Sequence, residues 1–357
     1  MKKITATFLL WLIVAAAVRS DDLPKYPPPA EVKAAFLKLL DRPKVPLDAR
    51  LHEARLGTDD LLTERLSFAS EKRADGAIER VPVLIVRPGK GGGRRPAVIV
   101  LHGTGGSKEA MRNWLVQFGK LGLVGVAIDA RYHGERVGVK NGSAAYNEAI
   151  ARAWRTTPGE KQEHPFYFDT CWDLWRTIDF LQTRDEIDPK KIGMMGISMG
   201  GIETWLAAAV DDRIAAAVPL IGVQSFHWSL ENDRWQARAN TIKLAHQTAA
   251  KDLGETAVNA KVCRALWSKV IPGMLDQFDC PSMLRLFAGR PLLILNGEND
   301  PNCPIEGARI AFRSAEKAFA AAKASDRLKM LTAPGVGHTV TKEHAQETIA
   351  WFEKWLK

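Results

Sequence analysis

The chain has 357 residues, of which 46% are hydrophobic, and it carries a formal net charge of +9. This length and apolar content support one large core or two modest ones and exclude a disordered chain. Lys and Arg are scattered, and no basic run interleaved with aromatic residues indicates a nucleic-acid groove. We therefore expect a globular protein with a mildly basic, solvated surface and no nucleic-acid partner.

The first 20 residues have the features of a secretory signal peptide. They combine Lys2 and Lys3, an apolar stretch too short for a comfortable membrane span, and small residues before a cleavage point after Ser20. An uncleaved N-terminal anchor is the alternative. No other segment approaches the roughly 18 uninterrupted apolar residues of a membrane helix. We expect a secreted or periplasmic protein without stable membrane insertion once residues 1–20 are removed.

Residues 21–79 are interpreted as an N-terminal extension with a helix and an edge strand. The Pro-rich segment 21–29 predicts an extended tether, and helical spacing begins at 30–40. Apolar and polar residues alternate over 61–68 and again over 80–87. This alternation predicts edge strands of a sheet.

Region 80–357 alternates short apolar strands with helices, which predicts an α/β fold with a mostly parallel central sheet and helices on both faces. Strands are predicted at 97–101, 123–128, 192–197, 214–221, 291–296 and 328–332. Helices are predicted at about 108–120, 167–184, 200–209, 306–322 and 342–356. Functional residues are expected at the C-terminal ends of the strands.

Residues 224–289 separate two of these strands and are too many for a simple crossover. Helical spacing and several aromatic residues predict a helical cap insertion over the site, which limits substrate size and supplies no catalytic group. Trp228 and Phe226 are candidates for a wall of the substrate pocket, although such aromatic residues are more often packing core. The irregular stretch 132–165 is expected to form the opposite rim.

The most informative motif is the G-x-S-x-G pattern at residues 196–200, directly after an apolar strand. This pattern is typical of a nucleophile elbow, in which a strand reverses sharply into a helix. Glycine on both sides leaves room for the chain to pass closely, and the middle residue projects from the turn. Ser198 is therefore the predicted nucleophile.

A serine hydroxyl needs a neighbouring base and an acid that orients the base. Asp300 follows the predicted strand 291–296 and is the predicted acid, with Glu298 as the alternative. His338 lies in a Gly-rich loop before the last helix and is the predicted general base. His344 is the other downstream histidine, but it falls within the C-terminal helix, where we expect it to face solvent.

Two backbone N–H groups are needed to bind the oxyanion of the tetrahedral intermediate. The first is expected from Met199, the residue after the nucleophile. The second is expected from the loop after strand 97–101, where Thr104 is favoured and Gly103 is the alternative. His102, at the start of this loop, is interpreted as a structural histidine.

In combination these motifs resemble the α/β-hydrolases, and more narrowly the dienelactone hydrolase, acetyl xylan esterase and prolyl oligopeptidase-type catalytic domains. The matching segments are 102–106, 129–134, 196–200, 297–300 and 337–338. The resemblance implies the α/β-hydrolase fold. The chain has Tyr132 and His133 where that group commonly reads Asp-x-Arg-Gly-x-Gly. Ser198 also departs from dienelactone hydrolases proper, which have Cys, so a dienelactone substrate is not implied.

The expected function is that of a secreted serine hydrolase that cleaves carboxylic esters through an acyl-enzyme. We expect a small-molecule or polysaccharide ester substrate and neither a cofactor nor a metal; the sequence does not specify the oligomeric state. One alternative is a peptidase or acyl-peptide hydrolase of the prolyl oligopeptidase type. Another is a catalytically silent binding protein on the same fold, against which the intact set of Ser198, Asp300 and His338 argues.

The four cysteines lack the close spacing of a metal site. They are Cys171, Cys263, Cys280 and Cys303. Cys280 and Cys303 flank the strand before the predicted acid and are the favoured disulfide pair, with free buried thiols as an equal alternative. Residues 141–143, Asn-Gly-Ser, match a glycosylation acceptor, which is a weak pattern.

Overall fold

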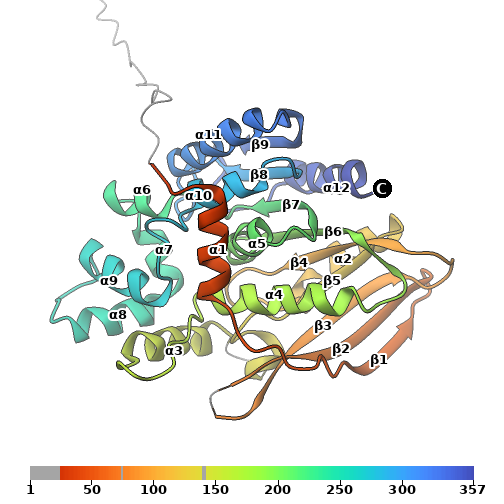
Figure 1. Cartoon of the computed structure of the whole chain (residues 1–357), viewed down its shortest axis with the longest axis horizontal. Helices are drawn as coiled ribbons and strands as arrows, with labels where there is room; N and C mark the ends of the chain where they lie inside the picture. Colours follow the sequence, from red (N-terminus) through yellow and green to blue (C-terminus); the bar gives the residue numbers. More distant parts are fainter. Residues whose placement is uncertain (1–24, 74, 139–141) are drawn as a thin grey trace, which may run out of the picture.

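The computed structural model describes residues 25–357 except 74 and 139–141, so the predicted signal peptide at 1–20 and Asn141 of the glycosylation motif lie outside the described residues. The described part of the chain forms one nine-stranded sheet in the order β1-β2-β3-β5-β4-β6-β7-β8-β9 (Figure 1). The strands are β1 (Arg50–Leu56), β2 (Leu61–Lys72), β3 (Ile78–Pro88), β4 (Arg95–Leu101), β5 (Val124–Ile128), β6 (Ile187–Ile197), β7 (Ile214–Leu220), β8 (Leu292–Gly297) and β9 (Leu328–Ala333).

Helices connect these strands and cover the sheet. Those outside the insertion are α1 (Pro29–Leu39), η2 (Lys108–Met111), α2 (Arg112–Lys120), η3 (Gly134–Val137), α3 (Gly142–Arg155), α4 (Phe168–Leu181), α5 (Met199–Val210), α11 (Ile305–Ala321), η5 (Ser325–Arg327) and α12 (Lys342–Leu356). Those of the insertion are α6 (Phe226–Glu231), α7 (Gln236–Thr241), α8 (Lys243–Asp252), α9 (Ala260–Val270), α10 (Cys280–Met283) and η4 (Leu284–Phe287). No helix among the described residues is both long and apolar enough to cross a bilayer.

The sheet is parallel from β5 through β4 and β6 to β9, whereas β1, β2, β3 and β5 pair antiparallel. The central strand β4 is buried on both faces. Its Ala97, Ile99 and Leu101 join the cluster that contains α4, α5 and α11, and its Val98 and Val100 join the cluster that contains α2 and α12. Because alternate side chains of a strand point to opposite faces, helices cover both sides of the sheet, as predicted.

The N-terminal strands differ from the prediction in one respect. β2 pairs with β1 and β3, and β3 pairs with β2 and β5, so neither is an edge strand. The edge is β1, in which every residue is exposed. A strand without a buried face has no apolar alternation, and its charged residues protect the edge from further pairing. The expected boundary near residue 79 cuts through β3, so the extension and the main domain share one sheet.

The sequence analysis expects the stretch 132–165 to be irregular, but it contains the helix α3. This helix buries Tyr146, Ile150 and Ala153, which follow helical spacing. α3 packs against α8 and α9 of the insertion, and a bidentate ion pair joins Arg155 to Asp252 at 2.7 and 2.8 Å. The expectation of two opposite rims is therefore wrong: α3 and α6–α9 form one unit, which we call the helical lobe.

The insertion is helical, as predicted, but it divides into two parts. Its helices α6–α9 gather with α3 at the end of the molecule opposite the C-terminus (Figure 1). By contrast, α10 contacts α1, α5 and α11, and η4 contacts α1 and α11. The last residues of 224–289 therefore belong to the helical layer on the sheet.

All four cysteines are buried free thiols, so the favoured disulfide between Cys280 and Cys303 is not formed and the alternative is confirmed. The thiol of Cys303 instead donates to the carbonyl of Ile221 at 3.2 Å. Burial raises the pKa of this thiol to about 12, so it is neutral at pH 7.

Candidate active site

Ser198 lies at the turn between β6 and α5, with φ 56° and ψ −110°. This is a strained backbone conformation for a residue other than glycine. A Cβ on Gly196 would lie 2.2 Å from the carbonyl oxygen of Gly200, and a Cβ on Gly200 would lie 2.6 Å from the Cβ of Leu101. The close approach of strand and helix therefore requires glycine on both sides of Ser198, as the G-x-S-x-G pattern predicts.

A continuous chain of hydrogen bonds joins the three predicted catalytic side chains. The Nε2 of His338 lies 2.7 Å from the Oγ of Ser198, and its Nδ1 lies 2.7 Å from Oδ2 of Asp300. A carboxylate only accepts hydrogen bonds, so Nδ1 carries the proton and Nε2 is the acceptor for the serine hydroxyl. The three residues follow β6, β8 and β9. Ser198 and His338 are 140 positions apart in the sequence, and the fold brings them into contact.

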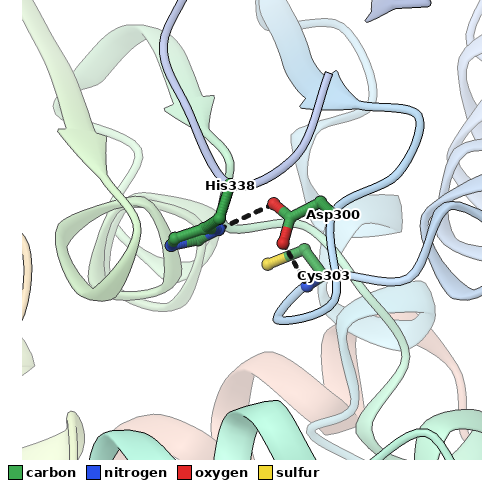
Figure 2. Close-up of side chains that lie close together, drawn as sticks. All are labelled: Asp300, Cys303 and His338. Atoms are coloured by element: carbon green, nitrogen blue, oxygen red, sulfur yellow. Dashed lines mark hydrogen bonds and ion pairs between the residues drawn. The ribbon is translucent and has the colours of Figure 1, made fainter. Parts of the chain in front are cut away.

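The second oxygen of Asp300 is also engaged. Oδ1 accepts the backbone N–H groups of Asn302 at 2.8 Å and Cys303 at 3.0 Å. These bonds form a compact turn, residues 300–303, which we call the acid turn. Figure 2 shows its carboxylate directed toward the ring of His338, with Cys303 on the same turn. With 3% of its surface exposed, Asp300 is held by the protein on both oxygens.

Neither alternative residue, Glu298 or His344, takes part in this chain of hydrogen bonds. Glu298 is exposed, and its Oε2 accepts the N–H of Gly335 at 2.9 Å, so it braces the loop that carries His338 and not the imidazole. His344 is fully buried, which corrects the expectation that it faces solvent. It lies in the first turn of α12, where its N–H donates to the Oγ1 of Thr341 at 3.1 Å in a capping box.

The loop after β4 forms a tight turn beside the nucleophile. The N–H of Gly106 donates to the carbonyl of Gly103 at 3.0 Å, and a Cβ on Gly103 would lie 3.6 Å from the Cβ of Ser198. The turn thus borders the serine side chain. Met199 is the first residue of α5, where backbone N–H groups have no acceptor within the helix. Oxyanion binding by Met199 and by Thr104 or Gly103 remains a prediction that fits this arrangement.

His102 holds the turn in place, which confirms its interpretation as a structural histidine. Its Nδ1 donates to the carbonyl of Gly103 at 2.8 Å, and its Nε2 accepts the N–H of Ala130 at 3.2 Å. Both nitrogens are therefore used with the ring neutral. Burial lowers the pKa of His102, and burial also lowers the pKa of the adjacent His133 to about 3.

Buried charges fix the loop after β5, the segment in which the chain has Tyr132 and His133. Arg131 donates to both carboxylate oxygens of Asp173 at 2.6 and 2.9 Å, and Arg136 adds a bond to the same carboxylate at 2.7 Å. Burial opposes ionisation of Asp173, but the two guanidinium groups hold its pKa far below the usual value. The sequence analysis did not single out this network, whose members lie on different elements.

The helical lobe touches the site at two places. A Cβ on Gly105, in the turn after β4, would lie 2.6 Å from the Oγ of Ser143 at the start of α3. On the other side, Arg238 of α7 donates to the carbonyl of Asn302 in the acid turn at 3.0 Å. The lobe therefore reaches from the turn after β4 to the acid turn.

The predicted pocket residues have different environments. Phe226 is fully buried, with its ring 5.6 Å from Trp267 and 6.3 Å from Tyr167, so the structure places it in the core of the lobe. Trp228 is half-buried, and a Cβ on Gly307 would lie 3.5 Å from its indole ring. The indole thus lies against α11. Contact between Trp228 and a substrate remains a prediction.

Cavity size alone does not locate the site. A cleft of about 660 Å³ lies between α1 and α4 and is lined by Trp172, Trp175 and Arg213 but by none of the predicted site residues. A more polar cleft of about 590 Å³ includes Asp300 and lies between the lobe and the start of α11. The hydrogen-bond chain of the three side chains is the more specific indicator.

Among the described residues, one group of side chains has metal-ligating atoms close together. Ligand atoms of Asp300, Cys303 and His338 all lie within 4.8 Å of one another (Figure 2). A metal would need the Cys303 thiolate, whereas burial raises the pKa of that thiol to about 12. It would also displace the bond between Asp300 and His338. The three atoms therefore fit a metal poorly.

Comparison with known families gives two matches along the chain. The family model for acetyl xylan esterases (AXE1) matches residues 31–227, which is more than half of the chain. A model for TAP-like proteins of the α/β-hydrolase type matches residues 279–351. The first match contains Ser198, and the second contains Asp300 and His338.

Individual proteins give a consistent picture. The Bacillus subtilis protein YtaP, named as a hydrolase, is 24% identical over 291 residues, which cover 78% of this chain and 84% of YtaP. An acetyl xylan esterase from Paenibacillus sp. R4 superposes with a TM-score of 0.61 at 20% identity, covering 94% of this chain and 98% of that chain. A glucuronoyl esterase from Solibacter usitatus superposes with a TM-score of 0.64 at 13% identity, covering 95% and 100%. These structures share the α/β-hydrolase fold with this chain.

Proposed function

The chain belongs to the acetyl xylan esterase family, and on that premise we propose that it cleaves carboxylic esters through an acyl-enzyme formed on Ser198. It is a hydrolase that acts on ester bonds; the proposal concerns the residues and the steps. The observation that carries it is the placement of His338 within 2.7 Å of both Ser198 and Asp300. This is the geometry of a nucleophile, a general base and an orienting acid.

In the first step, the Oγ of Ser198 attacks the carbonyl carbon of the ester while Nε2 of His338 takes the hydroxyl proton. The ring becomes an imidazolium, which Asp300 stabilises through the bond to Nδ1. The negative charge that develops on the carbonyl oxygen is stabilised by the backbone N–H groups of Met199 and Thr104. Fixed donors of this kind are already oriented for the transition state before the substrate arrives.

In the second step, the tetrahedral intermediate collapses and breaks the bond to the alcohol oxygen. His338 returns its proton to that oxygen, and the acyl group remains on Ser198. A water molecule then gives a proton to Nε2 as it attacks the acyl carbon, and a second collapse releases the acid and restores the serine hydroxyl. These steps need only protein groups and water, so the proposal includes no cofactor or metal.

We propose an acetylated polysaccharide or a small acetate ester as the substrate. Support comes from the family match and from the printed names of the structural neighbours, which include acetyl xylan esterases. The helical lobe limits the size of the acyl or alcohol group, with Trp228 as a candidate contact. Secretion to the extracellular space or periplasm rests on the signal-like residues 1–20.

The test is a panel of p-nitrophenyl esters of increasing acyl length, run beside acetylated xylan on the protein that starts after residue 20. We expect turnover of the acetate ester and release of acetate from xylan. The matched control is Ser198→Ala, which should remove both activities. Hydrolysis of peptide amides with no ester turnover would replace the esterase proposal with a peptidase, and no turnover of either class would favour a silent binding protein.

A further inference from the structure

Arg238 connects the helical lobe to the acid turn. It belongs to α7, and only 1% of its surface is exposed. Its Nη2 donates to the carbonyl oxygen of Asn302 at 3.0 Å and to the Sγ of Cys303 at 3.3 Å, and its Nη1 lies 3.5 Å from the phenol oxygen of Tyr167. The buried guanidinium therefore contacts the acid turn through the carbonyl of Asn302 and the thiol of Cys303.

The peptide group that Arg238 contacts, between Asn302 and Cys303, is one of the two that hold the catalytic acid. The N–H groups of Asn302 and Cys303 donate to Oδ1 of Asp300, while Oδ2 accepts from His338. The acid turn is thus fixed by the carboxylate on one side and by the guanidinium on the other. A shift of the turn would change the direction of the carboxylate relative to the imidazole.

The charge of Arg238 has a specific counterpart. Within the described residues, no carboxylate forms a direct ion pair with it. Burial disfavours the charged form of Arg238, and the carboxylate of Asp300 favours it. Burial also raises the pKa of Cys303 to about 12 and the pKa values of Tyr167 and Tyr146, so these groups are neutral at pH 7. Among these groups, the Asp300 carboxylate is therefore the negative charge that acts on the guanidinium.

The ring of His338 therefore faces a carboxylate whose charge is partly offset. Its two nitrogens contact Asp300 and Ser198, and the Sγ of Cys303 lies within 4.8 Å of the ring. A nearby cation disfavours protonation of an imidazole, whereas an uncompensated carboxylate favours it. Arg238 thus acts on His338 through Asp300 and the acid turn.

We infer that Arg238 is a positioning residue for the catalytic triad, which holds the acid turn and thereby directs the carboxylate of Asp300 toward His338. The inference rests on the proposed function and goes beyond it. It gives the insertion a part in supporting the chemistry, in addition to the expected limit on substrate size.

The test compares Arg238→Met, which removes the charge, with Arg238→Lys, which keeps the charge but lacks the forked donors. The matched control is Arg264→Gln, which removes an exposed charge from α9 of the same lobe. The first readout is the pH dependence of kcat/KM for p-nitrophenyl acetate. The second is the protonation of His338, followed by NMR in protein labelled with 15N-histidine, which needs no turnover.

In Arg238→Met, we expect both the acidic limb of kcat/KM and the midpoint of His338 protonation to move up by about one pH unit. In Arg238→Lys, both midpoints should stay within about 0.3 units of the parent, while kcat falls several-fold at unchanged KM because the turn is less firmly held. Arg264→Gln should match the parent, since water screens an exposed charge.

Unchanged midpoints in Arg238→Met, together with a normal fold, would leave Arg238 a structural residue only and overturn the inference. If Arg238→Met does not fold, Arg238→Lys decides: a shifted midpoint or a parental kcat would contradict the inference. A parent protein that hydrolyses no ester would overturn the proposed function instead. In that case the NMR titration would still measure the effect of Arg238 on His338.

Discussion

The triad and the helical lobe are held in place in different ways. The three triad side chains follow β6, β8 and β9, parallel strands whose ends meet at one edge of the sheet. The lobe is assembled from side-chain contacts between helices, such as the ion pair of Arg155 with Asp252 and the bond from Trp267 to His246. Backbone topology therefore brings the three proposed triad side chains together, whereas side-chain packing holds the helices of the lobe together. Changes in the two regions should have effects of different kinds.

The largest effect is expected in the triad. Asp300→Asn should lower kcat by roughly 10⁴, because an amide cannot support the imidazolium and favours the wrong tautomer of His338. The fold should persist, since an amide oxygen can still accept from Asn302 and Cys303. Steady-state kinetics with p-nitrophenyl acetate and a thermal melt measure the two outcomes.

Glu298→Gln is the matched control, because it is the same chemical change on the same loop. It should lower kcat by less than about tenfold, since an amide oxygen can still accept the N–H of Gly335. A larger loss in Glu298→Gln than in Asp300→Asn would move the orienting acid to Glu298 and break the geometric account of the triad.

In the lobe, the largest effect should be on stability. Phe226→Ala removes a fully buried ring that packs against Trp267 and Tyr167 and should cost about 3–5 kcal/mol in the free energy of unfolding. Urea denaturation measures this loss. Little loss of stability combined with an altered preference among esters would instead support the prediction that Phe226 lines the substrate pocket.

The lobe also carries a pH-dependent contribution. Burial lowers the pKa of His246 to about 4, and its Nε2 accepts the Nε1–H of Trp267 at 3.0 Å. The unfolded chain binds a proton below about pH 6.5 that the folded protein does not bind, so this stability is present above pH 6.5 and is lost as the pH falls toward 4. The loss approaches about 1.4 kcal/mol per pH unit.

His246→Gln isolates this contribution. Urea denaturation of parent and variant at pH 7 and pH 5 should show a smaller loss of stability in the variant, by about 2 kcal/mol. Asp279 acts in the opposite direction, because burial raises its pKa to about 6, but it is present in both proteins and cancels from the comparison. Equal losses in parent and variant would show that folding does not lower the pKa of His246.

The smallest effect concerns selectivity. Trp228→Ala should change the ratio of kcat/KM between short and long acyl esters by roughly tenfold, because a truncated pocket wall alters a few CH₂-sized contacts. Turnover of the acetate ester should survive. Equal suppression of every ester in a folded variant would assign Trp228 to the support of the triad through α11, and an unchanged ratio would assign it to packing alone.

The same contrast explains what the sequence could predict. Ser198, Asp300 and His338 each follow an apolar strand and sit in a short Gly-containing segment, so local patterns were sufficient to find them. Most of the parallel strands are short apolar runs buried on both faces, and their predicted bounds agree with the structure to within two residues, except that β6 begins five residues earlier. β9 was also predicted, although its residues are mostly half-buried. Along the sheet the strands follow the chain order, except that β5 lies between β3 and β4.

The remaining features do not show in the periodicity of the sequence. β1 has no buried face to give an alternating pattern, and the burial of His344 depends on the capping box with Thr341. Arg238 is one of many arginines in the sequence, and only the packing of α7 against the acid turn distinguishes it. Periodicity does not specify how helices of an insertion pack on a sheet.

The central claim, that Ser198 forms the acyl-enzyme, is tested most directly by covalent labelling. The protein is treated with a fluorophosphonate that phosphonylates activated serines, and the labelled peptide is identified by mass spectrometry. We predict one label per chain on Ser198, no label in Ser198→Ala, and labelling slowed by orders of magnitude in Asp300→Asn. A label on another serine, or persistent labelling of Ser198→Ala, would contradict the account.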